Sequence, residues 1–111
     1  MLPGFATSTI TRERATMVQD SHHNSVPDWS DPDALDIAGC SIQPGVTLED
    51  RQNRDTTLIA YTVWAPAGVD VLSTDRIRIG LDVFEIDGEP ERWITGLSVD
   101  HTKLFLRRWE G

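Results

Sequence analysis

Apolar residues alternate with polar ones over short stretches of this chain, and no stretch keeps helical 3.6-residue spacing for more than two turns. The strongest apolar run, residues 58–65, has apolar side chains on both faces of an extended chain, which is typical of a central strand. Arg and Ile alternate over residues 76–79, which predicts a half-buried strand. Further strands are expected at residues 7–14, 35–43, 83–86 and 96–109.

Turn-forming residues separate these stretches, for example in the polar cluster at 21–25 and in Asp87-Gly88-Glu89-Pro90. Strict alternation places Ile37 and Cys40 on opposite strand faces. Trp64 lies inside the predicted central strand, so we expect it in the core. About six short strands divided by turns predict an all-β fold, a small β-barrel or sandwich. We expect one domain over residues 1–111, with an extended N-terminal arm.

One segment without apolar periodicity is long for so small a domain. Residues 45–57 contain almost nothing apolar beyond Val46 and Leu48. Loops of this length inside compact domains are usually functional or disordered. The segment is therefore a candidate functional loop.

The charge narrows the classes of partner. The chain has 111 residues, with 18 acidic and 10 basic side chains and a net charge of −8. Gripping nucleic acid or an anionic membrane requires clustered Lys and Arg, so neither is expected. No apolar run approaches the length of a membrane span, and the N-terminal sequence predicts no export signal. Residues 15–50 hold seven acidic residues and no Lys or Arg, which indicates a solvated edge or a surface for a positive partner.

The residues that carry chemistry form no recognisable catalytic or metal site. His22 and His23 lie in a polar cluster, which favours a solvated turn over a metal site. Asp residues between 28 and 36 lack the glycine and terminal glutamate of a calcium loop. Cys40 lies mid-strand, where a buried thiol acting as a small hydrophobe is the default. No nucleophile–base pair or phosphate loop is visible, so we expect neither an enzyme nor a cofactor.

Tryptophan is frequent, with four residues, and three of them fall in turns or at the chain end. Large rings at such places either pack the rim of a small barrel or contact another subunit, where Trp is a common hot spot. Phe5, in the N-terminal arm, has the same two options. The candidate interface residues are therefore Phe5, Trp29, Trp93 and Trp109.

Several short motifs occur in a characteristic order. Asp28-Trp29-Ser30 is followed by Gly39-Cys40-Ser41-Ile42-Gln43-Pro44, by Ala65-Pro66-x-Gly68-x-Asp70, and by Ile86-Asp87-Gly88-Glu89-Pro90. In this order and spacing the chain resembles the head-to-tail stopper (head-closure) proteins of long-tailed bacteriophages. The likeness extends from about Thr9 to the last residue. It departs at the first turn, where the family often has Gly-Asn and this chain has His23-Asn24.

The resemblance implies a β-barrel subunit that forms a ring with copies of itself, commonly six, in the neck of the virion after assembly in the host cytoplasm. Such a ring lies below the portal and its adaptor protein and above the tail terminator or tail tube protein, and it closes the DNA-filled head. DNA would be a passing strand that is not gripped. The resemblance also implies that a loop enters the channel and gates DNA exit. The residues of that loop here are Thr47, Leu48, Glu49, Asp50, Arg51, Gln52, Asn53, Arg54 and Asp55.

Two other functions remain open from the sequence. A tail terminator or tail-completion protein also forms rings of small β-rich subunits. A small-ligand or carbohydrate-binding β-barrel would instead be a stable monomer with a concave aromatic pocket.

Overall fold

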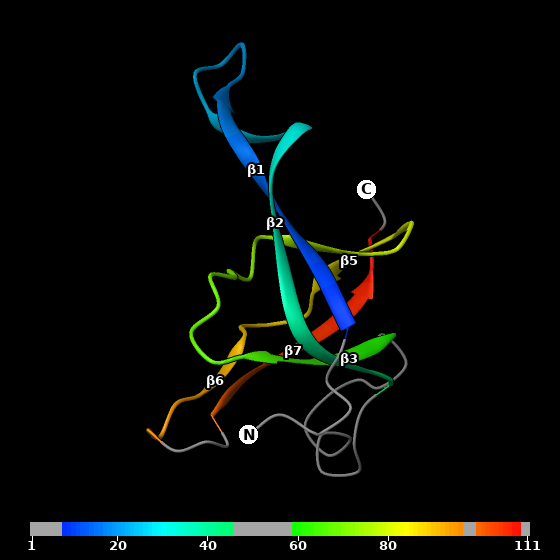
Figure 1. The fold of residues 1–111 in the computed structure, drawn as a ribbon. Coiled ribbons are helices and arrows are strands. Elements are labelled where there is room, and N and C mark those ends of the chain that lie inside the picture. The colour runs from blue at the N-terminus through cyan, green and yellow to red at the C-terminus, as the bar shows by residue number, and fades with distance from the viewer. Residues whose placement is uncertain (1–7, 46–58, 97–99, 110–111) are drawn as a thin grey trace.

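A computed structural model describes residues 8–45, 59–96 and 100–109 of the chain (Figure 1). The predicted gating loop, residues 47–55, lies outside the described residues. So do Phe5 and the predicted N-terminal arm before residue 8.

The described residues form seven antiparallel strands and no helix, which confirms the all-β prediction. In chain order the strands are β1 (Ser8–Gln19), β2 (Ser25–Pro44), β3 (Tyr61–Pro66), β4 (Arg76–Ile79), β5 (Asp82–Ile86), β6 (Glu91–Trp93) and β7 (His101–Arg108). The sheet order is β3-β2-β1-β4-β5-β7-β6, and β3 also pairs with β7. Six strands therefore close into a barrel, and the short β6 extends the sheet beside β7.

The first two strands are much longer than predicted, with 12 and 20 residues, and form one long hairpin. Their turn lies where the polar cluster predicted it. The Asp20 carboxylate accepts the backbone N–H groups of His22 (2.8 Å) and Asn24 (3.0 Å). His23 adopts a φ of 63°, a left-handed conformation that Gly or Asn adopts more readily. The length was missed because polar side chains on both faces of residues 15–34 hide the strand pattern.

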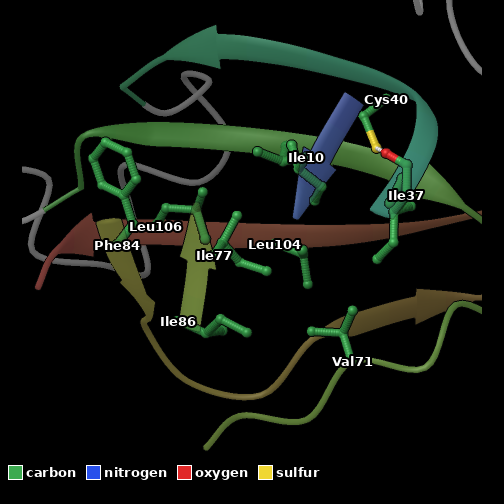
Figure 2. Packing of buried hydrophobic residues seen from close by; sticks show 11 residues of the cluster. Ile10, Ile37, Cys40, Val71, Ile77, Phe84, Ile86, Leu104 and Leu106 are labelled. Atoms are coloured by element: carbon green, nitrogen blue, oxygen red, sulfur yellow. Dashed lines mark hydrogen bonds between the residues drawn. The ribbon is translucent and has the colours of Figure 1, made fainter. Parts of the chain in front are cut away.

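The core fills the inside of the barrel with side chains from the six strands that close it and from Val71, in the segment between β3 and β4 (Figure 2). On β4, β5 and β7 the core residues alternate along the strand, as the sequence pattern predicts. The cluster comprises Ile10, Ile37, Cys40, Val63, Ala65, Val71, Ile77, Phe84, Ile86, Leu104 and Leu106.

The predicted separation of Ile37 and Cys40 onto opposite faces is wrong, since both are in the core. From Ser8 to Ile10 β1 advances two residues, while β2 runs back three, from Cys40 to Ile37. The extra residue is a β-bulge, which restores both side chains to one face. Gly39 provides it with a φ of +73°, which a side chain would strain. Burial raises the pKa of the Cys40 thiol to about 11, so it stays protonated and packs as a hydrophobe.

The prediction that Trp64 lies in the core is also wrong. Its neighbours Val63 and Ala65 are fully buried inside the barrel, so Trp64 lies on the outer face and is half-buried. The Lys103 ammonium lies 5.6 Å from the centroid of its ring.

The contribution of side-chain packing inside the barrel to the free energy of unfolding can be measured with two matched substitutions. Leu106 is 0% exposed, whereas Leu81, in the β4–β5 turn, is 95% exposed. We expect Leu106→Ala to lower the free energy of unfolding by about 2–5 kcal/mol, because it leaves a cavity. Leu81→Ala should change it by less than about 0.5 kcal/mol. Urea denaturation measures both, and equal losses would contradict the barrel core.

Candidate assembly surface

The β1–β2 hairpin extends well beyond the barrel, as Figure 1 shows at the top of the molecule. Among the described strands, β1 pairs with β4 only over Thr11–Glu13, and β2 pairs with β3 only over Ser41–Pro44. We call residues 15–32, beyond the Arg14–Asp33 pair, the distal hairpin. A two-stranded ribbon is marginally stable on its own in water, so the distal hairpin depends on side-chain contacts.

A large bulge sets the direction of the distal hairpin. Between the pairs Arg14–Asp33 and Thr16–Asp28, β1 advances two residues and β2 runs back five, which leaves three extra residues in β2. The Asp28 carboxylate accepts the Ser30 hydroxyl (2.7 Å) and its backbone N–H (3.0 Å), and these bonds lower the pKa of Asp28. The bulged segment contains Trp29, which turns toward the barrel.

Trp29 meets Trp109, from the end of the described chain, in an edge-to-face contact with ring centroids 5.4 Å apart. The guanidinium carbon of Arg76 lies 4.3 Å from the centroid of Trp29 and 5.4 Å from that of Trp109. We call these three residues the tryptophan–arginine clamp. Two of the three predicted interface tryptophans, Trp29 and Trp109, thus make the rim-packing contact that the sequence left open beside a subunit contact.

The clamp rests on a row of alternating charges across four strands. Glu13, Arg76, Glu85 and Arg107 are successive cross-strand partners. The Arg76 Nε–H donates to Glu13 Oε1 (2.7 Å), Arg78 Nη2 donates to Oε2 (2.9 Å), and Arg107 is ion-paired with Glu85 (2.6 Å). Burial of the Glu13 carboxyl raises its pKa, but the bonds and charges of the two arginines outweigh this effect, so the pKa is lowered.

On the other side of the hairpin, Arg14 fastens the segment between β3 and β4. Its Nε and Nη2 donate to the two carboxylate oxygens of Asp75, each at 2.9 Å, and its Nη1 and Nη2 donate to Asp70. Asp75 is buried and also accepts the backbone N–H of Leu72 (2.8 Å). A bidentate Arg–carboxylate pair is geometrically specific, so this segment is held at a defined distance from β1.

A groove of about 610 Å³ lies between this segment, the distal hairpin and the clamp. Much of its wall is apolar, and two of the wall residues, Met17 and Leu72, are 58% and 48% exposed. Its charged residues are those paired above. The groove is lined by Arg14, Ala15, Met17, Pro27, Trp29, Leu72, Ser73, Thr74, Asp75, Glu85, Ile86, Arg107 and Trp109. Such a surface can take up an apolar group.

The third described interface candidate, Trp93, is not part of the groove. It is 52% exposed at the end of β6, stacks on His101 with centroids 6.1 Å apart, and is followed by Ile94, which is 61% exposed. The Asp100 carboxylate accepts the backbone N–H groups of Thr95 (2.9 Å) and Gly96 (2.8 Å). These bonds order the described part of the connection between β6 and β7. We call Trp93 and Ile94 the β6–β7 tip.

Sequence reasoning did not single out Met17, Leu72 or Ile94. Each is a lone apolar residue in a polar setting, which is a weak signal in sequence alone. His22 and His23 are exposed in the hairpin turn, away from the groove. In the described part of the chain, no three His, Cys, Asp or Glu side chains are placed to hold a metal ion.

Comparison with known proteins supports the fold. No protein-family model and no curated protein matches the chain. Its structure is similar to the solution structure of protein SF1141 from Shigella flexneri 2a, at 16% sequence identity and a TM-score of 0.67, over 97% of this chain and 98% of that one. At this identity the likeness shows the fold alone. No helix in the described residues is long and apolar enough to cross a membrane.

The charge row predicts a specific pH dependence. We expect Glu13→Gln to lower the free energy of unfolding by about 2 kcal/mol at pH 7, because it leaves Arg76 and Arg78 without their carboxylate. The folded-state pKa of Glu13 lies below its ordinary value of 4.5. Its stabilisation is therefore complete above about pH 4.5 and is lost as the pH falls through the lowered value.

The difference between the variant and the wild type should thus shrink as the pH falls below about 4.5, in urea titrations across pH 3–7. Glu89→Gln is the matched control, because Glu89 is exposed in the β5–β6 turn. A Glu13 effect that is constant with pH, or equal to that of the control, would contradict the charge row.

Proposed function

We propose that this chain is a structural subunit of a bacteriophage neck that acts without catalysis. Copies of it form a ring of the head-to-tail stopper kind, which closes the filled head below the portal adaptor and presents a surface to the tail. The resemblance in motif order to that family is the sequence observation behind this proposal. The single structural observation that supports ring building is the distal hairpin, a two-stranded ribbon that leaves the barrel and exposes apolar side chains.

The exposed surface supports association. At the end of the hairpin Met17 and Val18 are 58% and 39% exposed. Neighbouring apolar side chains that are exposed together on a projecting ribbon favour contact with another subunit. A neighbouring copy is the partner that a ring provides.

The acidity of the chain fits a passage for DNA. A basic wall would hold the strand by releasing counterions from its phosphates, whereas an acidic wall lets it slide. In this proposal residues 47–55 form the gate, and the ring lies in the virion neck. Contacts between exposed charges on neighbouring gates are worth only about 0–1 kcal/mol each, so such a gate can open.

A tail terminator ring is the alternative in the same particle, and localisation separates the two. A stopper copurifies with DNA-filled heads that lack tails, and a terminator copurifies with free tails. One observation favours a different class, a small-ligand-binding barrel, because the groove volume lies within the range of ligand sites. That function requires a stable monomer.

Removal of the distal hairpin tests ring building. Replacing residues 17–27 by Asn-Gly joins the paired residues Thr16 and Asp28 through a two-residue turn and retains the clamp. We expect the variant to stay folded but to form no rings under conditions where the wild type assembles. Native mass spectrometry and negative-stain microscopy measure assembly, and circular dichroism measures folding.

The control is Leu81→Ser. Among the described residues outside the hairpin, Leu81 is the most exposed large apolar residue, and this variant should assemble normally. Rings of normal abundance from the shortened variant would exclude the hairpin as the assembly element. A wild-type chain that is monomeric at all concentrations, alone and with tail-less heads, would exclude the proposed function.

A further inference from the structure

We infer that the β6–β7 tip of one copy inserts into the groove of the next copy, so that each contact joins two different surfaces of the chain. This inference rests on the proposed function and specifies its contact. The tip is the exposed apolar pair Trp93 and Ile94. The groove lies under the distal hairpin of the neighbouring copy.

A chain cannot fill its own groove with its own tip. Trp93 is the cross-strand partner of His101, whereas the groove is lined by Arg107 and Trp109 of the same strand and its end. The six residues from His101 to Arg107 span about 20 Å of extended chain. The tip is fixed there by β6–β7 pairing, and Figure 1 shows β6 at the opposite end of the molecule from the distal hairpin.

The two surfaces match in polarity. The tip presents one large aromatic and one branched aliphatic side chain, and the groove of about 610 Å³ has Met17, Leu72 and two Trp rings in its wall. Aromatic rings prefer edge-to-face or offset contacts, and Trp29 and Trp109 already make one. Trp is also enriched among interface hot spots.

The charged side chains of the groove are already paired, which favours an uncharged occupant. In the groove, Arg14 is paired with Asp75 and Asp70, and Arg107 is paired with Glu85. An ionic ligand would break these pairs, whereas an apolar group leaves them intact. Residues 93–96, Trp-Ile-Thr-Gly, carry no charge. The occupant is therefore the uncharged tip of another copy rather than a charged peptide or a nucleotide.

A contact between two different patches is heterologous, and repeated use of it gives a ring when the rotation closes. Each subunit then uses its tip once and its groove once. Because every copy carries a net charge of −8, copies repel one another at long range. Salt screens this repulsion without weakening an apolar contact, so assembly should increase with salt concentration.

Two variants of the full chain test the contact. Trp93→Ala removes the aromatic side chain of the tip, and Leu72→Glu places a carboxylate in the groove. Both residues are about half exposed, so the folded monomer should keep its urea midpoint. Each variant should raise the subunit dissociation constant at least tenfold in sedimentation velocity experiments across 50–500 mM NaCl. Leu81→Glu is the matched control, outside both surfaces, and should assemble like the wild type.

Mixing the two variants gives the decisive result. The Trp93→Ala chain keeps an intact groove and the Leu72→Glu chain an intact tip, so one good contact forms and the mixture should yield 1:1 heterodimers but no rings. Rings of normal abundance from either variant alone would overturn the inference and leave the proposed function standing. Two defective variants that form no heterodimers on mixing would overturn the contact between tip and groove. A wild type that is monomeric at every salt concentration, both alone and with tail-less heads, would remove the proposed function itself.

Discussion

The guanidinium of Arg76 is the point on which the barrel, the distal hairpin and the end of the chain converge. It is held by Glu13 of β1 and lies against both Trp29 and Trp109. A partly desolvated cation–π contact is worth about 1–2 kcal/mol, and a charge-assisted hydrogen bond contributes a similar amount. Without Arg76, the bulge and the tryptophan wall of the groove would lose one of the contacts that hold them, and the contact between the two rings would remain.

This dependence follows from the way the sheet is paired. Strand pairing with β4 ends at Glu13, and the register breaks between Arg14 and Thr16, so backbone hydrogen bonds to a third strand cannot orient the distal hairpin. Side chains do so instead, through the clamp on one side and the Arg14–Asp75 pair on the other. The hairpin is thus fixed at its base, while Met17 stays largely exposed. The same contacts that hold the hairpin shape the groove beneath it.

Local pattern was sufficient to predict the all-β class, the strand at 76–79 and the turns at 21–25 and 87–90, because these depend on neighbouring residues. It failed where register decides: one extra residue at Gly39 placed Ile37 and Cys40 on the same face. The three-residue β6 was too short to give a pattern. The groove was beyond sequence reasoning, because its wall comes from β1, β2, β5, the end of β7 and the 72–75 segment, which only the fold brings together.

The acidity of the chain acts on two interactions at once in the proposed ring. It keeps DNA phosphates from binding the wall, and it also makes the copies repel one another. Attraction between copies must therefore be short-ranged and apolar, and the exposed tip and the groove offer that kind of contact at two ends of one chain. Repulsion between copies would weaken when their negative charges are screened by salt or neutralised by a partner surface. At low salt, a ring built in this way would therefore assemble more readily on a docking platform, such as the portal adaptor of the proposed neck, than free in solution.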